Sequence, residues 1–449
     1  MTNRGNDPVD VYAQAFEQAR TALPGDDLLG RLREQAWSSF VSRGFPGPRE
    51  EDWKYTSLRP LAKREFRLSP AAPDAVPAER IDAAAFPGLD CHRLVFVNGA
   101  FAPALSDPAP DRDDVHIESL ASLLSRGPAN ATIATGGLAR HADIEAHRFA
   151  ALNTAFLRDG AFIHAGRDTR PGKPVYLLFV STPGADPIVT HPRVLITAEP
   201  GASLTVVEHF IGVDDAANFT NTVTELAAAA GACVEHYKVQ DESRQGFHIG
   251  SLHVRQDRDS RVFSQHIDLG GYLSRNDIHV ALDGEGAEVT LNGLYLAGGR
   301  QHMDSHTRIE HLKPHTRSSE DYRGVLRDRA RAVFNGKIRV HEDAQKIEAN
   351  QTNRNLLLSD QAEIDTKPEL EIYADDVKCT HGATIGQLDE DALFYLRSRG
   401  IGDDMARGLL TFAFADGVIA RFGLEPIRRH LENIVIGRLP DTERLREFV

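Results

Sequence analysis

The sequence predicts a mainly β core, a β-helix or solenoid, with α-helical regions before and after it. Between residues 166 and 386, short apolar runs of strand length alternate with polar turns. A motif of small or polar residues leading into an apolar one recurs at intervals of 30, 28, 27, 44 and 31 residues, which is typical of stacked coils. An antiparallel sandwich would give similar turns, but tight hairpin signals are scarce, which favours the solenoid. The apolar positions that mark the motif are Leu204, Val234, Val262, Val289, Val333 and Ile364.

The composition is that of a globular protein with more than one structural unit. The chain has 449 residues, 41% apolar and 26% charged. Its net charge of −14 argues against nucleic acid or an anionic membrane as the main partner. Three widely separated cysteines give no disulfide framework, which fits a reducing compartment. Because the N-terminus is polar and no apolar run reaches membrane-span length, we expect a cytoplasmic protein.

The first region, residues 1–165, is expected to be mostly helical, with a linker and a short strand. Apolar residues recur at helical spacing over 11–19 and 28–40. An Ala- and Pro-rich stretch at 71–88 predicts a linker, and residues 94–97 before Asn98-Gly99 predict a strand that enters a turn. Residues 115–158 are expected to be helical again.

The last region, residues 387–449, is expected to form three helices. Acidic residues at Asp389, Asp403 and Glu425 mark their starts, because carboxylates stabilise helix N-termini. The helices carry more large apolar residues than so small a bundle can bury. These residues either pack on the end of the solenoid or form a docking surface for a partner, and both interpretations stay open.

Enzyme signatures are missing from the sequence. It contains no G-x-x-x-x-G-K-[ST] phosphate loop, no G-x-S-x-G nucleophile elbow, no H-E-x-x-H zinc motif and no dinucleotide fingerprint. We therefore expect no catalytic activity and no ATP hydrolysis by this chain. A β-helix enzyme acting on polysaccharides is the enzymatic alternative, although such enzymes usually work outside the cell.

Two sets of residues could bind metal. The first is Cys379 and His381, which share a face if their segment is a strand, with Cα atoms roughly 6–7 Å apart. A Cys-x-His pair alone is a weak signal, because a closed zinc site needs four ligands, and free cysteine is most often a small buried apolar residue.

The second set lies in the 44-residue interval, where we expect a His-rich loop. A metal site is one interpretation of these histidines, and surface or cross-coil positions are the other; a further histidine group in the strand region is expected to pack across coils. The first group is His302, His306, His311 and His315, and the second is His236, His253, His266 and His279.

The run from Asn350 to Thr384, NQTNRNLLLSDQAEIDTKPELEIYADDVKCTHGAT, resembles the core signature of the SufB/SufD family of iron–sulfur cluster assembly proteins. The segments WKYTS at 53–57, VFVNG at 95–99 and FYLRSRG at 394–400 extend the resemblance over most of the chain. Gly382 separates the sequence from SufB-type chains, which tend to carry an acidic residue there. The resemblance implies a right-handed parallel β-helix core.

The resemblance also implies a function, partners and a site. It implies a non-catalytic scaffold that pairs with a SufB-type homologue and binds a SufC-type ABC ATPase through its C-terminal helices. Whether the isolated chain forms homodimers stays open. It implies no resident cofactor, but a transient iron–sulfur cluster at the heterodimer interface, where His381 would supply a nitrogen ligand and Cys379 would support it. A SufB-type chain that holds the cluster itself, and a structural homodimer without a metal role, are the alternatives.

Overall fold

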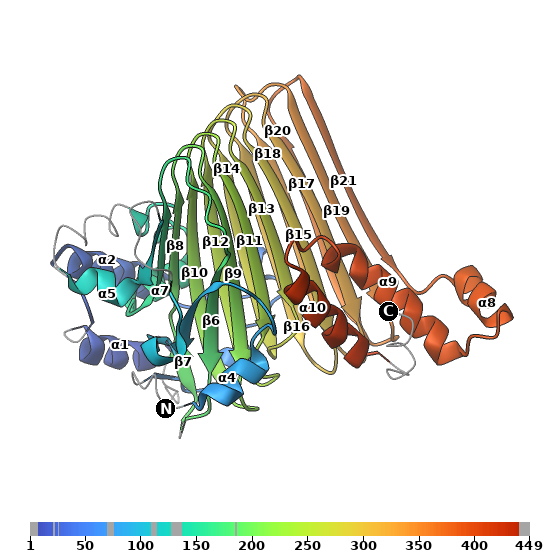
Figure 1. The fold of residues 1–449 in the computed structure, drawn as a ribbon, viewed down its shortest axis with the longest axis horizontal. Coiled ribbons are helices and arrows are strands. Elements are labelled where there is room, and N and C mark those ends of the chain that lie inside the picture. The colour runs from blue at the N-terminus through green and yellow to red at the C-terminus, as the bar shows by residue number, and fades with distance from the viewer. Residues whose placement is uncertain are drawn as a thin grey trace.

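Two large sheets face each other and together form a β-solenoid (Figure 1). The computed structural model describes residues 8–20, 23–25, 27–69, 76–108, 115–126, 137–184 and 186–439. From β8 onward the chain passes repeatedly from one sheet to the other, and each strand pairs in parallel with the strand one coil earlier. The predicted parallel solenoid with helices at both ends is therefore confirmed.

We name the two sheets A and B. Sheet A contains β1 (Arg67–Leu68), β4 (Val115–Ser119), β5 (Gly160–Ala165), β7 (Ile188–Thr190), β8 (Arg193–Ala198), β10 (Asn218–Ala228), β12 (Phe247–Gln256), β14 (Leu273–Leu282), β16 (His302–His311), β18 (Arg331–Val340) and β20 (Glu363–Ile372). Sheet B contains β2 (His92–Val97), β3 (Ala100–Phe101), β6 (Val175–Ser181), β9 (Ser203–Gly212), β11 (Cys233–Asp241), β13 (Arg261–Asp268), β15 (Glu288–Ala297), β17 (Arg317–Leu326), β19 (Ile347–Leu357) and β21 (Val377–Gly386).

The predicted sequence period corresponds to one coil, with one correction. Leu204, Val234, Val262 and Val289 lie side by side on successive strands of sheet B. The neighbour of Val289 on the next coil is Ser318, whereas Val333 belongs to sheet A. The 44-residue interval therefore arose because the marker position is a polar serine in that coil. The expected His-rich loop was wrong: residues 302–311 form strand β16 of the regular solenoid.

The N-terminal helices cover the outer face of sheet A. Aromatic and aliphatic side chains of α1, α2 and α7 pack with Phe219, Phe247 and Ile249, which point outward from that sheet. These helices, two short 3-10 turns and the remaining helices of the region are α1 (Pro8–Ala19), α2 (Asp27–Arg43), η1 (Glu51–Trp53), α3 (Arg59–Ala62), α4 (Ala78–Ala84), η2 (Pro103–Leu105), α5 (Leu120–Ser125) and α7 (Arg148–Ala155).

The helical prediction for residues 115–158 was partly wrong. Its first five residues form strand β4, which pairs antiparallel with β5 and extends sheet A. Helix α5 begins directly afterwards, where the Ser119 side chain accepts a hydrogen bond from the Ser122 backbone N–H. The strand was missed because Val115 and Ile117 alternate over only one short segment.

Three helices end the described chain, as predicted: α8 (Glu390–Ser398), α9 (Asp403–Ile419) and α10 (Glu425–Gly437). Helices α9 and α10 bury an apolar stripe against the outer face of sheet B, where Phe412 and Leu431 join the side chains of β15 and β17. Helix α8 stands beyond β21 (Figure 1). None of the described helices combines the length and apolar character that a membrane crossing requires.

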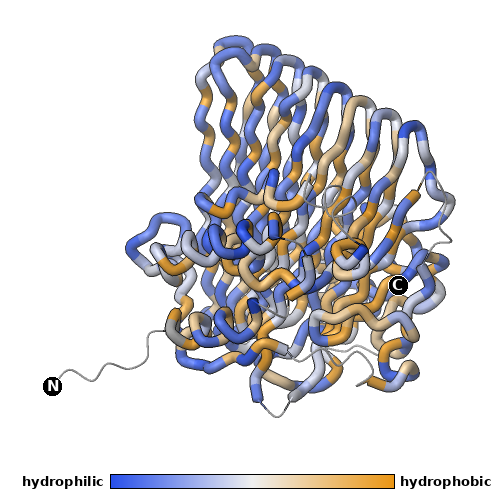
Figure 2. Tube along the Cα trace, turned by 90° about the vertical axis from the view of Figure 1, so that its left-hand side faces the viewer, coloured by the Kyte–Doolittle hydropathy of each residue, from blue (hydrophilic) through white to orange (hydrophobic). Residues whose placement is uncertain are grey.

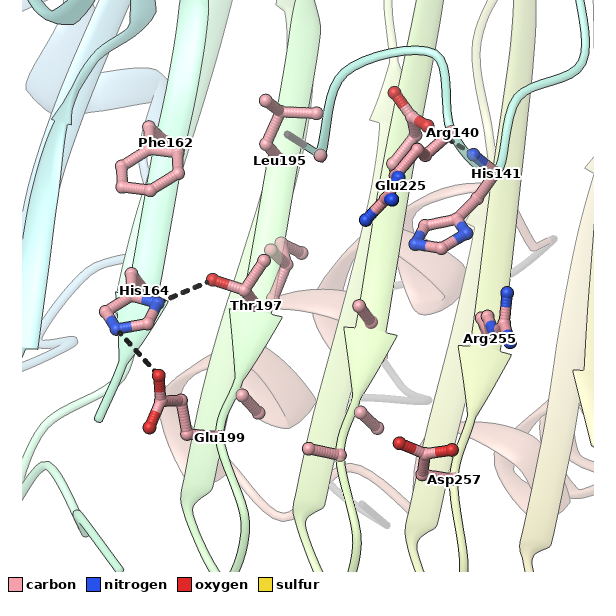
Figure 3. A pocket seen from close by; sticks show the side chains of 16 residues that line it. Arg140, His141, Phe162, His164, Leu195, Thr197, Glu199, Glu225, Arg255 and Asp257 are labelled. Atoms are coloured by element: carbon pink, nitrogen blue, oxygen red, sulfur yellow. Dashed lines mark hydrogen bonds and ion pairs between the residues drawn. The ribbon is translucent and has the colours of Figure 1, made fainter. Parts of the chain in front are cut away.

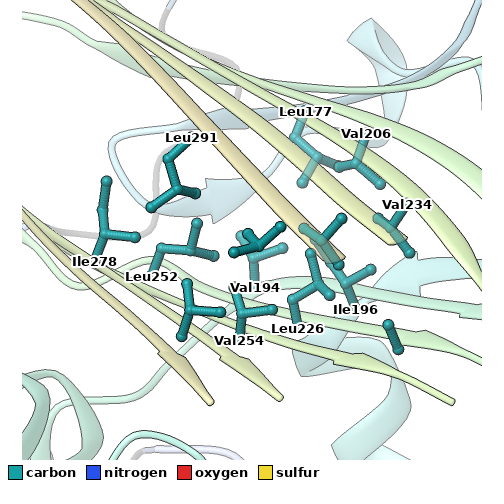
Figure 4. Close-up of a cluster of buried hydrophobic side chains, with 14 of the residues drawn as sticks. Leu177, Val194, Ile196, Val206, Leu226, Val234, Leu252, Val254, Ile278 and Leu291 are labelled. Carbon is teal, nitrogen blue, oxygen red and sulfur yellow. The ribbon is translucent and has the colours of Figure 1, made fainter. Parts of the chain in front are cut away.

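Along the length of each strand, the residues that point into the solenoid change from apolar to polar. Hydrophilic and hydrophobic residues alternate along the strands (Figure 2), because successive side chains point to opposite faces. At the apolar end, Leu226, Val234 and Leu252 interlock with their neighbours from both sheets (Figure 4). Further along the same strands the inward residues become polar, among them His236 and Lys238.

Candidate functional site

Cys379 and His381 lie on β21, the last strand of sheet B. They are two residues apart on one strand and therefore share a face, as predicted. Their neighbours on β19 are Ala349 and Gln351, whose side chains are buried inside the solenoid. The pair thus occupies the inward face of the last described coil of the solenoid.

The two side chains differ in exposure. Cys379 is half-buried and packs beside Val377 against the small apolar cluster around Ala349, whereas His381 is exposed. Burial raises the pKa of the Cys379 thiol above its usual value, so the neutral thiol predominates near pH 7. A metal or another cation close to the sulfur would reverse this preference, because the thiolate is the form that binds metal.

The donor set around the pair is incomplete. Across the described part of the chain, no group of three or more His, Cys, Asp and Glu side chains is placed to hold a metal ion. A thiol and an imidazole are donors that suit iron and iron–sulfur clusters. The described residues supply no further donor, so a complete coordination sphere would need additional ligands.

Both sheets end on an uncovered strand at this end of the molecule. No described strand pairs with the outer side of β20 or β21. Ile372, Tyr373 and Ile385, at or next to these two strands, are among the large apolar residues that remain exposed. Such edges are templates for pairing with another chain, and apolar side chains on them add favourable burial when they are covered.

A polar column lies beneath His381, and the sequence analysis missed it. Glu320 on β17, Gln351 on β19 and His381 on β21 are neighbours on successive strands and point inward. Gln351 Nε2 donates a hydrogen bond of 2.5 Å to Glu320 Oε2. Counting back from His381 by the coil period of about 30 residues would have found both positions.

A second group of buried polar side chains lies further inside the solenoid. His236 Nε2 lies 2.8 Å from Glu208 Oε1, and His236 Nδ1 lies 2.9 Å from Ser264 Oγ. Lys238 crosses the interior and donates to Asn276 Oδ1 at 2.6 Å. These hydrogen bonds join the named side chains to one another deep in the solenoid.

The predicted histidine groups do not form a metal site within the described residues. His302 contacts Thr56 Oγ1, and His306 lies 3.0 Å from Asp304 on the outer face of sheet A. His311 points inward and bonds to two hydroxyl groups, while His315 lies in a turn.

The second histidine group is divided between the two faces of the strands. His236 and His266 face the interior, in line with the expected cross-coil packing. His253 and His279 stack on the outer face with ring centroids 5.0 Å apart, and His147 of the N-terminal region lies 4.2 Å from His279. Burial lowers the pKa of His253 and His279, which keeps these rings neutral.

A cavity of ≈ 650 Å³ lies on the outer face of sheet A, over β5, β8, β10 and β12 (Figure 3). His164 Nδ1 lies 2.8 Å from Thr197 Oγ1, and Glu199 is the second neighbour of that ring. Glu225 accepts hydrogen bonds from backbone N–H groups of residues 139, 141 and 142, and it pairs with the buried Arg193. The hydrogen bonds of Glu225 fasten residues 139–142 of the N-terminal region to the solenoid.

Helix α8 presents a second exposed feature. The side chains of Phe394 and Tyr395 are 73% and 57% exposed, whereas the apolar residues of α9 and α10 are largely buried against sheet B. Of the two interpretations of the C-terminal apolar residues, packing therefore accounts for α9 and α10. It leaves the two aromatic residues of α8 without an explanation in this chain.

Comparison with known proteins gives a family for both parts of the chain. Residues 179–414 match the model of the SUF system FeS cluster assembly SufBD core domain, and residues 7–177 match that of the SufBD protein N-terminal region. An iron–sulfur cluster assembly SufBD family protein of Synechocystis sp. is 33% identical over 437 residues, which cover 95% of each chain. The iron–sulfur cluster assembly protein SufD of Escherichia coli is 33% identical over 413 residues, covering 92% of this chain and 93% of the relative. The chloroplastic protein ABCI7 of Arabidopsis thaliana is 29% identical over 435 residues, covering 95% and 90%.

Proposed function

Because this chain belongs to the SufBD family of iron–sulfur cluster assembly proteins, we propose that it is a non-catalytic, SufD-type scaffold subunit of the SUF machinery. In this proposal it pairs with a SufB-type homologue and binds a SufC-type ATPase, and it thereby supports cluster assembly and iron acquisition. The observation that carries the proposal is the uncovered edge of the solenoid, which displays an incomplete donor pair.

The edge supports pairing with a homologous chain. A partner built from the same two-sheet coil would meet both β20 and β21 at once, because its strands would have the same spacing and separation. Pairing of this kind would cover Ile372 and Ile385 and would satisfy the free backbone groups of both strands. A SufB-type homologue fits this requirement better than an unrelated protein.

The donor pair supports a role in holding the cargo. Covering the edge would enclose His381 and bring donors of the partner chain opposite the imidazole and the Cys379 thiol. The nascent iron–sulfur cluster is the substrate of this assembly. It would be released when the two chains separate, because its ligands would be divided between them.

The aromatic residues of α8 support binding of the ATPase. A SufC-type subunit that docks there would cover Phe394 and Tyr395, and its ATP-driven dimerisation would pull on the two scaffold chains. Since α8 stands beyond β21, such a pull would act close to the edge that carries the donor pair (Figure 1).

The test is the substitution His381→Ala in the complex of this chain with its SufB-type and SufC-type partners. Cluster formation from iron and a sulfur source is followed under anaerobic conditions by visible absorbance. We expect formation to fall to the background of the complex that lacks this chain. The matched control is Lys378→Ala, which changes an exposed residue on the opposite face of the same strand. Wild-type rates for His381→Ala would remove the donor role.

A SufB-type role, in which the chain holds the cluster by itself, is the second candidate. The incomplete donor set among the described residues disfavours it. Anaerobic reconstitution of the isolated chain separates the two roles, because a stable cluster absorbance without any partner would favour the SufB-type role.

A further inference from the structure

The inward column beneath His381 includes Gln351 Oε1, a buried acceptor to which no described residue donates a hydrogen bond. Gln351 is 1% exposed and Glu320 is 2% exposed, so both side chains are sealed from water. Gln351 Oε1 has no hydrogen-bond partner among the described residues. An unpaired buried acceptor is rare in native proteins, because it has lost its water without replacement.

The orientation of the Gln351 amide is set by its surroundings. Its Nε2 donates to Glu320 Oε2, so the amino group is turned toward the preceding coil. The same amino group occupies a slot above Gly336 of sheet A, where a Cβ would lie 2.3 Å from Nε2. The glycine and the Glu320 carboxyl group together hold the amide in place, and they leave its carbonyl oxygen, like Glu320 Oε1, without a partner among the described residues.

The next residue along the column is His381, one strand away. Neighbouring strands lie about 4.8 Å apart, a spacing that a glutamine carbonyl and an imidazole N–H bridge readily. His381 is exposed in the single chain, and a covering partner would press the ring back along the column. An imidazole that binds a metal through one nitrogen usually donates its other N–H to a carbonyl or carboxylate, which fixes its tautomer.

We propose that Gln351 is the positioning residue for His381: its carbonyl accepts the imidazole N–H when a partner chain covers the edge, and so turns the other ring nitrogen toward that partner. This inference rests on the proposed function. Glu320 acts one step further back, because it holds the amide so that the carbonyl, and not the amino group, faces the last coil. The sealed Glu320–Gln351 pair thereby extends the donor site two coils into the solenoid.

The experiment measures the tautomer of His381 in the assembled complex without cluster. The chain has 19 histidines, so ¹⁵N-histidine spectra are assigned by the signal that His381→Ala removes. We expect one tautomer to predominate in the wild-type complex. The substitution Gln351→Leu should reduce this preference roughly fivefold, which is the ratio that corresponds to one lost hydrogen bond. Gln351→Glu retains an acceptor and should preserve the preferred tautomer.

Controls separate positioning from general loss of structure. Thr352→Val alters the neighbouring residue, which points to the opposite face, and should leave the tautomer unchanged. Binding to the SufB-type partner, measured by sedimentation, should be equal for all variants. An unchanged tautomer ratio in Gln351→Leu would overturn the inference.

Cluster formation distinguishes this failure from failure of the proposed function. If His381→Ala abolishes cluster formation while Gln351→Leu behaves as wild type in both assays, only the positioning role is refuted. If His381→Ala itself has no effect on cluster formation, the donor role fails, whatever the tautomer measurement shows.

Discussion

Glu320 should make the solenoid less stable as the pH rises toward neutrality. Its carboxyl group is buried in the interior, and burial raises its pKa to about 7, outweighing the hydrogen bond from Gln351. The ordinary value is 4.5, so the folded chain binds a proton there that the unfolded chain releases between pH 4.5 and 7. The stabilisation is fully present below pH 4.5 and is lost as the pH rises through 7.

The size of the effect follows from the pKa difference. Each pKa unit corresponds to about 1.4 kcal/mol, so the difference from 4.5 to 7 amounts to about 3 kcal/mol of unfolding free energy. The substitution Glu320→Gln keeps the shape and the acceptor for Gln351 Nε2 but cannot ionise. Relative to wild type it should therefore gain up to about 3 kcal/mol between pH 5 and pH 8.

Glu208 is the matched control, because it is a buried glutamate in the same interior with the opposite behaviour. Burial alone would raise its pKa, but the hydrogen bond and charge of His236 lower it overall. Its stabilising contribution is present above pH 4.5 and is lost as the pH falls, so Glu208→Gln should destabilise the protein near pH 7. Urea unfolding from pH 5 to pH 8 measures both variants. A stability difference between Glu320→Gln and wild type that does not change with pH would refute the reasoning.

The interfaces and the N-terminal attachment give three further expected outcomes. Replacing Phe394 and Tyr395 together by glutamate should abolish binding of the SufC-type ATPase in pull-down assays without changing the melting temperature, because both side chains are exposed; undiminished binding would remove α8 from the docking surface. Ile385→Glu should weaken pairing with the SufB-type partner by roughly tenfold or more in sedimentation equilibrium, since it would bury an unpaired charge, and unchanged affinity would contradict pairing at this edge. Glu225→Ala should cost about 3–5 kcal/mol in urea unfolding, because it leaves the Arg193 guanidinium buried without its carboxylate. A loss below about 1 kcal/mol would show that the pair is not an anchor.

The period of the solenoid was predictable because each coil repeats the same local demand. After each turn, the first inward residue of the sheet B strand enters the apolar part of the interior and must itself be apolar. Leu204, Val234 and Val262 occupy this position on successive coils. The period was lost at Ser318 because the opposing inward residue there is His311, whose Nε2 lies 3.0 Å from the serine hydroxyl. A polar pair replaces an apolar one, so a hydrophobic pattern cannot detect the coil.

The donor pair was predictable only in its local geometry. Two residues on one strand share a face whatever the rest of the chain does, and this placed Cys379 beside His381. The contact between Gln351 and Glu320 depends instead on the register between strands about thirty residues apart. Register is set by the lengths of the intervening turns, which vary from coil to coil, so the column became visible only in the folded structure.

The position of the donor pair on the last coil resolves a conflict between rigidity and access. An inward side chain in an earlier coil is held by strands on both sides, but it is sealed, as His236 and His266 are. A side chain on a loop would be accessible, but parallel pairing would not align it. Strand β21 offers both, because β19 holds it in register while no described strand pairs with its other side. If His381 binds the cluster together with a partner, as proposed, its place on the last described coil gives it both alignment and access, whereas His236 further inside bonds to Glu208.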